Sequence, residues 1–335
     1  MTIPTETLSR YILRKEAEHP EATGELSELL TSIGVGVKMI GHLVASAGFM
    51  GTKGYTGNVN VQGEITHQLD EDADSILVEL LGASGHFGSL VSEERDGAIE
   101  TQAINKGAKY VVAFDPLDGS SNIGSNIPVG TIFTIFRICD DAVGARVEDF
   151  LQLGRRVVAA GYSVYGAKTS FVYSAGNGVH GFTLDRTIGE FVLTEESMQL
   201  PDSGNTYSVN EGYWEGWSPK LQEFVQSLRT SQNPTGKPFT SRYVGSLVAD
   251  FDRTLRKGGL FLHPGNAERP EGKLRLLYEC IPLAFIAEQA SGRASNGTAN
   301  ILDIEPKAIH ERSPFIVGSK REVEWYERQV GNQQS

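Results

Sequence analysis

The stretch that decides the fold is Tyr110–Asn122, which reads YVVAFDPLDGSSN. It begins with an apolar run of β-branched and aromatic residues, which predicts a buried strand over Tyr110–Phe114. Asp115 and Asp118 follow that run, and the Asp-Pro and Asp-Gly pairs predict a tight turn there. We expect both carboxylates at the carboxyl end of a sheet strand, where α/β proteins bind ligands.

The residues of this predicted turn suit a metal ion and a phosphate group. The carboxylates of Asp115 and Asp118, with a peptide carbonyl between them, are hard oxygen ligands of the kind that Mg²⁺ or Mn²⁺ prefers. Gly119, Ser120 and Ser121 offer successive backbone N–H groups and two hydroxyls, which a phosphate oxyanion requires. The alternative is a polar turn that caps a helix. The buried strand before the turn favours the ligand site.

Further acidic residues are candidates for the same site. Glu93 and Glu94 follow a short apolar run, and they are either a solvated surface pair or part of an acidic cluster. Glu279 lies within the apolar sequence LLYECIPLAF, where a charge is costly to bury without a partner. It is either paired with a Lys or Arg or bound to a metal. Crowded carboxylates repel one another unless cations neutralise them, so a cluster would favour a metal.

The rest of the chain alternates predicted helices and strands, which indicates stacked α/β layers. Apolar residues recur every three or four positions over residues 26–44, which predicts a long amphipathic helix. The polar segment 195–205 is a candidate domain boundary. Other predicted elements are helices over about 72–81 and 283–290, strands over 131–138, 206–209 and 259–262, and a hairpin over 171–182.

Composition narrows the class of protein. A length of 335 residues suggests about two domains, and 39% hydrophobic with 21% charged residues is typical of globular proteins. A net charge of −12 argues against nucleic acid and anionic membranes as partners. We find no apolar stretch near the ~18 residues of a membrane span and no signal peptide. Two distant cysteines, Cys139 and Cys280, indicate a reduced, cytoplasmic protein without a thiolate zinc site.

These segments resemble class I fructose-1,6-bisphosphatases, within the lithium-sensitive, metal-dependent sugar phosphatase superfamily. The resemblance covers nearly the whole chain, in the family's order. It implies an α/β fold, layered as an α-β-α-β-α sandwich, with an N-terminal allosteric and metal-binding domain over 1–196 and a C-terminal sugar-bisphosphate-binding domain over 197–335. The matching segments are SEE at 92–94, DPLDGSSN at 115–122, NEGY at 210–213, RYVGS at 242–246 and GKLRLLYEC at 272–280.

The resemblance implies Mg²⁺-dependent hydrolysis of the 1-phosphate of fructose 1,6-bisphosphate, in gluconeogenic or Calvin-type metabolism, with Mn²⁺ as another possible metal. The implied metal ligands are Glu93, Asp115, the Leu117 carbonyl, Asp118 and Glu279, with Glu64 where the family usually has Asp. Asp70 and Glu94 resemble the pair that activates water. The implied substrate contacts are Asp118, Gly119, Ser120 and Ser121 at the 1-phosphate, and Asn210, Tyr213, Arg242, Tyr243, His263 and Lys273 at the sugar and 6-phosphate.

Two positions differ from the family's usual residue, and a third implies contact between subunits. Arg242 resembles an arginine that reaches across a subunit interface, which implies a homotetramer. His263 stands where the family usually has Tyr; it would donate a hydrogen bond more strongly when protonated, giving pH-dependent affinity, or it is a tolerated polar replacement. Gly124 replaces a common Asp.

The start of the long predicted helix is a candidate regulatory site. The N–H groups and positive dipole end of a helix suit a phosphate, although a plain helix start capped by Thr23 or Ser27 is the alternative. The segment resembles the family's AMP-inhibition site, so we expect inhibition by AMP. That site would comprise Thr23, Gly24, Glu25, Leu26, Ser27, Lys109, Tyr110 and Arg137. The rival functions are a sedoheptulose-bisphosphatase or other sugar phosphatase, and a non-catalytic AMP sensor.

Overall fold

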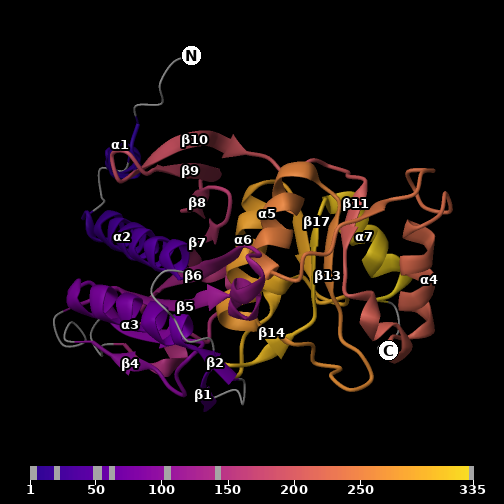
Figure 1. Ribbon diagram of the computed structural model, residues 1–335, viewed down its shortest axis with the longest axis horizontal. Helices are drawn as coiled ribbons and strands as arrows, with labels where there is room; N and C mark the ends of the chain where they lie inside the picture. Colours follow the sequence, from indigo (N-terminus) through magenta and orange to yellow (C-terminus); the bar gives the residue numbers. More distant parts are fainter. Residues whose placement is uncertain are drawn as a thin grey trace.

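The computed structural model describes residues 6–18, 23–47, 55–59, 65–101, 107–139 and 145–331. Helices and sheets alternate in five layers, seen from left to right in Figure 1. The predicted α-β-α-β-α sandwich is confirmed. Each sheet is apolar on both faces because a helical layer packs against it on each side.

The first layer contains α1 (Leu8–Glu16), α2 (Glu25–Ser46) and α3 (Gln68–Ala83), so both predicted N-terminal helices form. The N-cap of α2 is Gly24, with φ 79°, and it makes no side-chain capping bond. The alternative of a side-chain cap by Thr23 or Ser27 is therefore wrong. Glycine adopts this left-handed backbone without steric cost, and its carbonyl accepts the first helical hydrogen bond, from Glu28 N–H at 3.0 Å.

Contrary to the sequence expectation, α2 is long and apolar enough to cross a membrane, with a mean hydropathy of 1.5 over its best window. Lys38 and several glycines interrupt its apolar run, so the sequence shows no continuous apolar stretch of this length. Its residues Leu29, Ile33, Val37 and Ile40 are at most 1% exposed and belong to the core between the first layer and the first sheet. The helix is therefore explained as a core helix.

The first sheet has eight strands in the order β10-β9-β8-β7-β6-β5-β3-β4, and within it only β3 and β5 pair in parallel. The predicted strands over 110–114 and 131–138 and the predicted hairpin over 171–182 are all present. The strands are β3 (Phe87–Ser92), β4 (Ile99–Glu100), β5 (Tyr110–Asp118), β6 (Val129–Arg137), β7 (Val157–Tyr165), β8 (Thr169–Ser174), β9 (Val179–Asp185) and β10 (Glu190–Met198).

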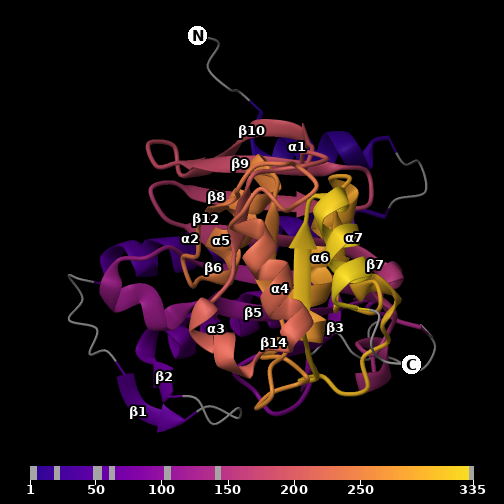
Figure 2. The same cartoon turned by 90° about the vertical axis from the view of Figure 1, so that its right-hand side faces the viewer.

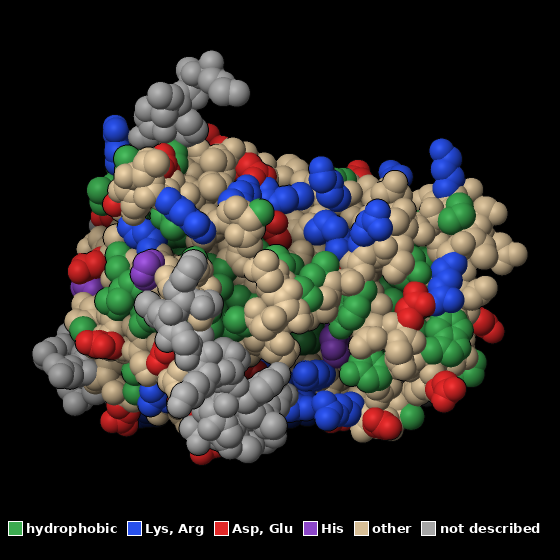
Figure 3. Space-filling model, in the orientation of Figure 1, with side chains coloured by type: hydrophobic (Ala, Val, Ile, Leu, Met, Phe, Trp, Pro, Cys, Tyr) green, Lys and Arg blue, Asp and Glu red, His purple; other side chains and the backbone are tan. Residues whose placement is uncertain are grey.

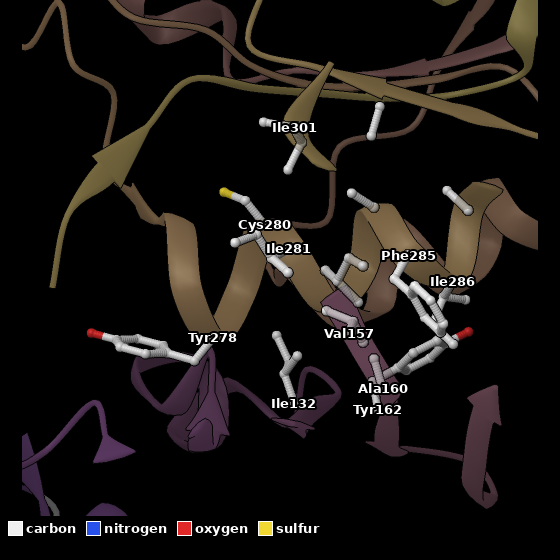
Figure 4. Close-up of a cluster of buried hydrophobic side chains, with 14 of the residues drawn as sticks. Ile132, Val157, Ala160, Tyr162, Tyr278, Cys280, Ile281, Phe285, Ile286 and Ile301 are labelled. Carbon is white, nitrogen blue, oxygen red and sulfur yellow. The ribbon is translucent and has the colours of Figure 1, made fainter. Parts of the chain in front are cut away.

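The middle layer holds α5 (Leu247–Lys257) and α6 (Ile281–Gln289), the latter preceded by a π-helical turn over Leu276–Cys280. Every residue of Ile281–Ala287 is buried, since α6 lies between the two sheets. Figure 4 shows side chains of this turn and of α6 packed against Ile132, Val157 and Tyr162 of the first sheet.

Proline explains the wide turn. Pro282 has no N–H to donate to the carbonyl of Tyr278, four residues earlier, and its ring would crowd that carbonyl in a regular α-helix. A π turn opens the backbone at this point.

The second sheet has the order β12-β11-β13-β17-β15, and α4 (Pro219–Leu228) and α7 (Lys320–Gln329) form the fifth layer (Figure 2). The predicted strands over 206–209 and 259–262 are confirmed. The strands are β11 (Thr206–Ser208), β12 (Thr240–Ser241), β13 (Leu260–His263), β15 (Arg293–Ser295) and β17 (Phe315–Gly318). Two small ribbons pair β1 (Tyr55–Val59) with β2 (Ile65–His67) and β14 (Leu274–Arg275) with β16 (Arg312–Ser313).

Candidate active site

A cavity of about 440 Å³ collects residues from both sheets and from the middle layer. On the face shown in Figure 3, Lys and Arg side chains gather beside a histidine near the centre of the molecule. Thirteen of the residues expected at the active site line this cavity: Asp70, Glu93, Glu94, Asp115, Leu117, Asp118, Gly119, Ser120, Ser121, Tyr243, His263, Lys273 and Glu279.

The Asp-rich segment is placed by β5, but the predicted turn begins later than expected. The strand continues through Asp115 and Asp118, with an irregular register against β6 between them. The tight turn starts at Gly119, whose φ is 78°, and continues as a 3-10 helix over Ser120–Ser125. Pairing with β6 keeps Asp115 and Asp118 in the strand, so both carboxylates are held on a rigid element.

Three carboxylates from distant segments meet in the cavity. One ligand oxygen from each of Glu93, Asp115 and Glu279 lies within 4.8 Å of the other two. Glu93 follows β3, Asp115 lies on β5, and Glu279 is placed by the π turn. We call these residues the acidic trio. The surface-pair interpretation of Glu93 is therefore wrong.

The acidic trio is electrostatically strained. Burial is the main reason that the pKa of Glu279 rises to about 8, and repulsion from Glu93 is the next cause. Burial, followed by repulsion from Glu93, Asp118 and Glu279, raises the pKa of Asp115 well above its usual value. Arg275 is the nearby cation, with Nη2 3.2 Å from Glu93 Oε1, and its backbone N–H donates to Glu279. One arginine does not balance three carboxylates, so the donor set fits a divalent cation.

Asp118 stands apart from the trio. Its Oδ2 accepts the backbone N–H of Val248 at 2.9 Å, in the first turn of α5. Burial raises the pKa of Asp118 to about 7, and this hydrogen bond opposes the shift. Leu117 lines the cavity, and its N–H donates to Asp115 Oδ1 at 3.0 Å, which fixes that carboxylate. Asp118 thus links the metal side of the cavity to the start of α5.

The expected water-activating residues lie at the same cavity. Asp70 is in the first turn of α3 and is 4% exposed, and Glu94 follows the strand that ends at Ser92. Glu64 lies outside the described residues. Both expected residues therefore border the cavity that contains the acidic trio.

The expected sugar-side residues divide between two cavities. A smaller cavity of about 160 Å³ contains Tyr213, and it shares His263 and Lys273 with the main one. Asn210 interacts with the Tyr243 hydroxyl. The side chain of Arg242 is exposed and lines neither cavity. His263, Lys273 and Tyr213 thus form a continuous rim.

His263 is not a cation in this site. Burial, followed by the charge of Lys273, lowers its pKa to about 4. Protonation of His263, and with it the expected stronger hydrogen bond, therefore requires acid pH in the free protein. Gly124 lies in the 3-10 turn with open space around its α-carbon, so a side chain would fit there, and nothing in the structure explains the glycine.

The candidate nucleotide site is also brought together. Lys109 Nζ lies 2.9 Å from Glu25 Oε2 and 3.4 Å from Thr23 Oγ1, which joins the start of α2 to the start of β5. Tyr110 is the register partner of Arg137 at the end of β6. Gly24, Leu26 and Ser27 lie on the same helix start. These residues come from three elements and share one end of the first sheet.

Two residues of the main cavity were not predicted from the sequence. Arg275 is 2% exposed and pairs with Glu93, and Asp250 is fully buried at the cavity wall. The sequence did offer a signal for Arg275, because a cation four residues before Glu279 is a candidate partner for its carboxylate. Asp250 lies in an ordinary amphipathic helix, and nothing in its sequence neighbourhood singled it out.

The comparisons with known proteins agree with this geometry. Family models described as "Fructose-1-6-bisphosphatase, N-terminal domain" and "Fructose-1-6-bisphosphatase, C-terminal domain" match residues 6–196 and 200–330. A "Fructose-1,6-bisphosphatase class 1" of Sorangium cellulosum is 47% identical over 325 residues, which cover 97% of this chain and 93% of the relative. One of Chloroherpeton thalassium is 45% identical over 318 residues, which cover 95% and 91%.

A solved structure, the holo form of Leishmania major fructose-1,6-bisphosphatase, superposes with a TM-score of 0.91. It is 38% identical and covers 98% of this chain and 100% of its own. Sequence and structure therefore agree over both sheets and over the cavity between them. The chain belongs to the class 1 fructose-1,6-bisphosphatase family.

Proposed function

We propose that this chain hydrolyses the 1-phosphate of fructose 1,6-bisphosphate, releasing fructose 6-phosphate and phosphate. The observation that carries the proposal is one cavity holding the acidic trio, the Gly119–Ser121 turn and Lys273. An acidic cluster, phosphate donors and a separate cation match a sugar with a phosphate at each end.

The groups that would hold Mg²⁺, with Mn²⁺ as an alternative, are Glu93, Asp115, Glu279, Asp118 and the Leu117 carbonyl. Glu64, which lies outside the described residues, would join them. When bound, such ions neutralise phosphate charge and act as Lewis acids. The acidic trio fits this role because it lacks enough positive charge of its own.

The chain's own residues supply orientation and proton transfer. Backbone N–H groups of Gly119, Ser120 and Ser121 hold the phosphate oxygens during transfer. Asp70 or Glu94 accepts the proton of the water that attacks phosphorus. The phosphorus–oxygen bond to C1 breaks, and the sugar oxygen takes up a proton.

The other end of the sugar would contact the rim. Lys273 supplies positive charge for the 6-phosphate, and Tyr243, Tyr213, Asn210 and His263 supply hydrogen bonds. Arg242 would enter the cavity of a neighbouring subunit, which fits its exposure outside its own cavity. We therefore propose a cytoplasmic homotetramer, which light scattering and cell fractionation test.

We also propose the division into an N-terminal allosteric and metal-binding domain over 1–196 and a C-terminal sugar-binding domain over 197–335. The trio itself spans this division, because Glu279 belongs to the second part. Expression of the two parts separately tests it: metal binding should require both.

The direct test is phosphate release from fructose 1,6-bisphosphate with Mg²⁺. Glu93→Gln removes a trio carboxylate and should lower kcat by at least 10²-fold. Glu100→Gln is the matched control, because Glu100 is an exposed residue on the edge strand β4. Sedoheptulose 1,7-bisphosphate measured in parallel tests the rival substrate. Absence of turnover in a folded wild type that binds AMP would favour the sensor.

We further propose inhibition by AMP at the start of α2, with Lys109 and Arg137 neutralising its phosphate and Tyr110 contacting the nucleotide. The support is the convergence of these residues, and β5 connects Tyr110 directly to Asp115. AMP titrations should show a rise of at least tenfold in its inhibition constant in Lys109→Met. Lys38→Met, which removes the Lys38–Glu190 pair elsewhere on α2, is the control. Unchanged activity under AMP would refute the regulation.

A further inference from the structure

The loop 242–246, between β12 and α5, contributes Tyr243, Gly245 and Ser246 to the wall of the main cavity. We propose that Asp250, on α5, is a positioning residue that sets this loop for sugar binding, and the proposal rests on the proposed function. Asp250 acts through Tyr243 and the loop backbone rather than on the reacting phosphate. We call the interactions of Asp250 and Asn122 with this loop the loop clamp.

The Asp250 carboxylate binds the loop backbone directly. Its Oδ2 accepts the N–H of Val244 at 3.1 Å and that of Gly245 at 3.0 Å. Its Oδ1 accepts Ser208 Oγ, from β11. Asp250 is 0% exposed, so these bonds form away from water, where a donor left without a partner is costly.

An arginine completes the same network. Arg253 Nη1 lies 3.0 Å from Asp250 Oδ1, and it also donates to the carbonyl of Arg242 at 2.5 Å. Ser208 Oγ lies 2.9 Å from the same carbonyl, so its single proton is shared between Arg242 O and Asp250 Oδ1. The loop is therefore held on both sides of Tyr243, at residues 242 and 244.

The far side of the loop is fixed to the phosphate turn. Asn122 Nδ2 donates to the Gly245 carbonyl at 2.9 Å, and Gly245 has φ 83°, a conformation that glycine allows. A β-carbon placed on Gly119 would lie 3.2 Å from Ser246 Oγ, so the two segments are in close contact. Gly245 is thus held through its N–H by Asp250 and through its carbonyl by Asn122.

This arrangement separates two kinds of effect. The loop clamp acts on the sugar side of the cavity, whereas the acidic trio is built from β3, β5 and the π turn. Loss of the clamp should weaken contacts with the sugar and leave the site of phosphate transfer in place. The binding of fructose 6-phosphate and the binding of inorganic phosphate should therefore respond differently.

The test is Asp250→Asn, which keeps the shape of the side chain but places an amide N–H₂ against backbone donors. We expect the KM for fructose 1,6-bisphosphate and the inhibition constant of fructose 6-phosphate to rise at least tenfold. The kcat and the inhibition constant of inorganic phosphate should change by less than threefold. The measurements use the full-length protein with saturating Mg²⁺.

Asp252→Asn is the matched control. Asp252 is on the same helix and is also paired, with Tyr162 Oη at 2.8 Å and Arg256 Nε at 2.9 Å, but it makes no contact with the loop among the bonds of the described residues. It should leave the KM and both inhibition constants within twofold of the wild type. Equal effects of the two substitutions would overturn the proposal, since they would indicate general destabilisation.

Asn122→Ala tests the opposite side of the loop clamp, and serves if Asp250→Asn does not fold. It should raise the fructose 6-phosphate constant two- to fivefold without changing that of phosphate. A fall in kcat at constant KM, or parallel weakening of both ligands, would overturn the proposal. Failure of the proposed function is distinguishable, because it would appear already in the wild type as an absence of phosphate release, and both proposals would then fall.

Discussion

His263 illustrates how neighbours decide the chemistry of one residue. It is the last residue of β13 and borders both cavities, beside Lys273. The sequence identified the position but not its charge, because neither the depth of burial nor the approach of Lys273 is visible in the sequence. A ring kept neutral by its surroundings still donates one hydrogen bond and accepts another.

This neutrality predicts an acid-sensitive stability. The pKa of His263 is about 4 in the folded chain and about 6.5 in an unfolded one. Between these pH values the unfolded chain binds more protons than the folded chain. The neutral His263 therefore contributes fully to the stability of the fold above about pH 6.5, and this contribution is lost as the pH falls toward 4. The free energy of unfolding should fall between pH 7 and pH 5, and His263→Gln should make this fall smaller by roughly 1–2 kcal/mol, after allowance for partial solvent exposure. Urea unfolding at both pH values measures it, and identical losses in both proteins would contradict it.

At the scale of elements, an ion pair joins α3 to the segment that carries Glu93 and Glu94. Asp74 of α3 is 4% exposed, and Arg95 Nη2 lies 2.7 Å from its Oδ2. Arg95 directly follows Glu93 and Glu94, so this ion pair fixes the end of β3 relative to α3. His310 Nε2 bonds to the Arg95 carbonyl at 2.9 Å, which attaches the same segment to the C-terminal part of the chain.

The two partners of this ion pair should contribute unequally. Arg95→Ala leaves a buried carboxylate without its cation and should lower the free energy of unfolding by about 2–3 kcal/mol. Asp74→Asn leaves an arginine that reaches water, and should cost less than about 1 kcal/mol. Urea unfolding of both variants measures the difference. Equal losses would show that burial of Asp74 does not decide the stability of the pair.

Prediction from the sequence succeeded where one element carries the pattern. The apolar run Tyr110–Phe114 predicted β5, and the periodicity over 26–44 predicted α2. Prediction was weaker where the structure depends on pairing between strands that are distant in the sequence. Hydrogen bonds to β6 extended β5 through the expected turn, and Arg275 became a site residue only because β14 brings it beside Glu93. Such contacts join segments far apart in the chain, and no local pattern records them.

At the scale of the whole molecule, the active site depends on the two sheets being assembled around the middle layer. The trio joins β3 and β5 of the first sheet to the π turn, which precedes the buried helix α6. The folded state alone holds these carboxylates together, so a cation that binds them should stabilise folding.

Mg²⁺ should therefore raise the melting temperature. At about 100 times its dissociation constant, linkage gives about 2.7 kcal/mol, which corresponds to a rise of several degrees. Glu279→Gln should melt in EDTA at the wild-type temperature or above, because one repelling group is removed, and should gain little from Mg²⁺. Calorimetry with and without Mg²⁺ measures both proteins. An equal rise in the variant would place the stabilising ion elsewhere.

The π turn before α6 makes the length of the chain as important as its chemistry. A π turn is an α-helix with one residue inserted, and each residue advances an α-helix by about 100°. Deleting one residue between Arg275 and Pro282 would restore α-helical spacing and swing the Glu279 carboxylate away from Glu93 and Asp115, although every ligand would remain in the sequence. The number of residues in this segment therefore matters as much as which residues they are. In an alignment of related chains, a gap of one position here would indicate loss of the metal site even where every ligand residue is present.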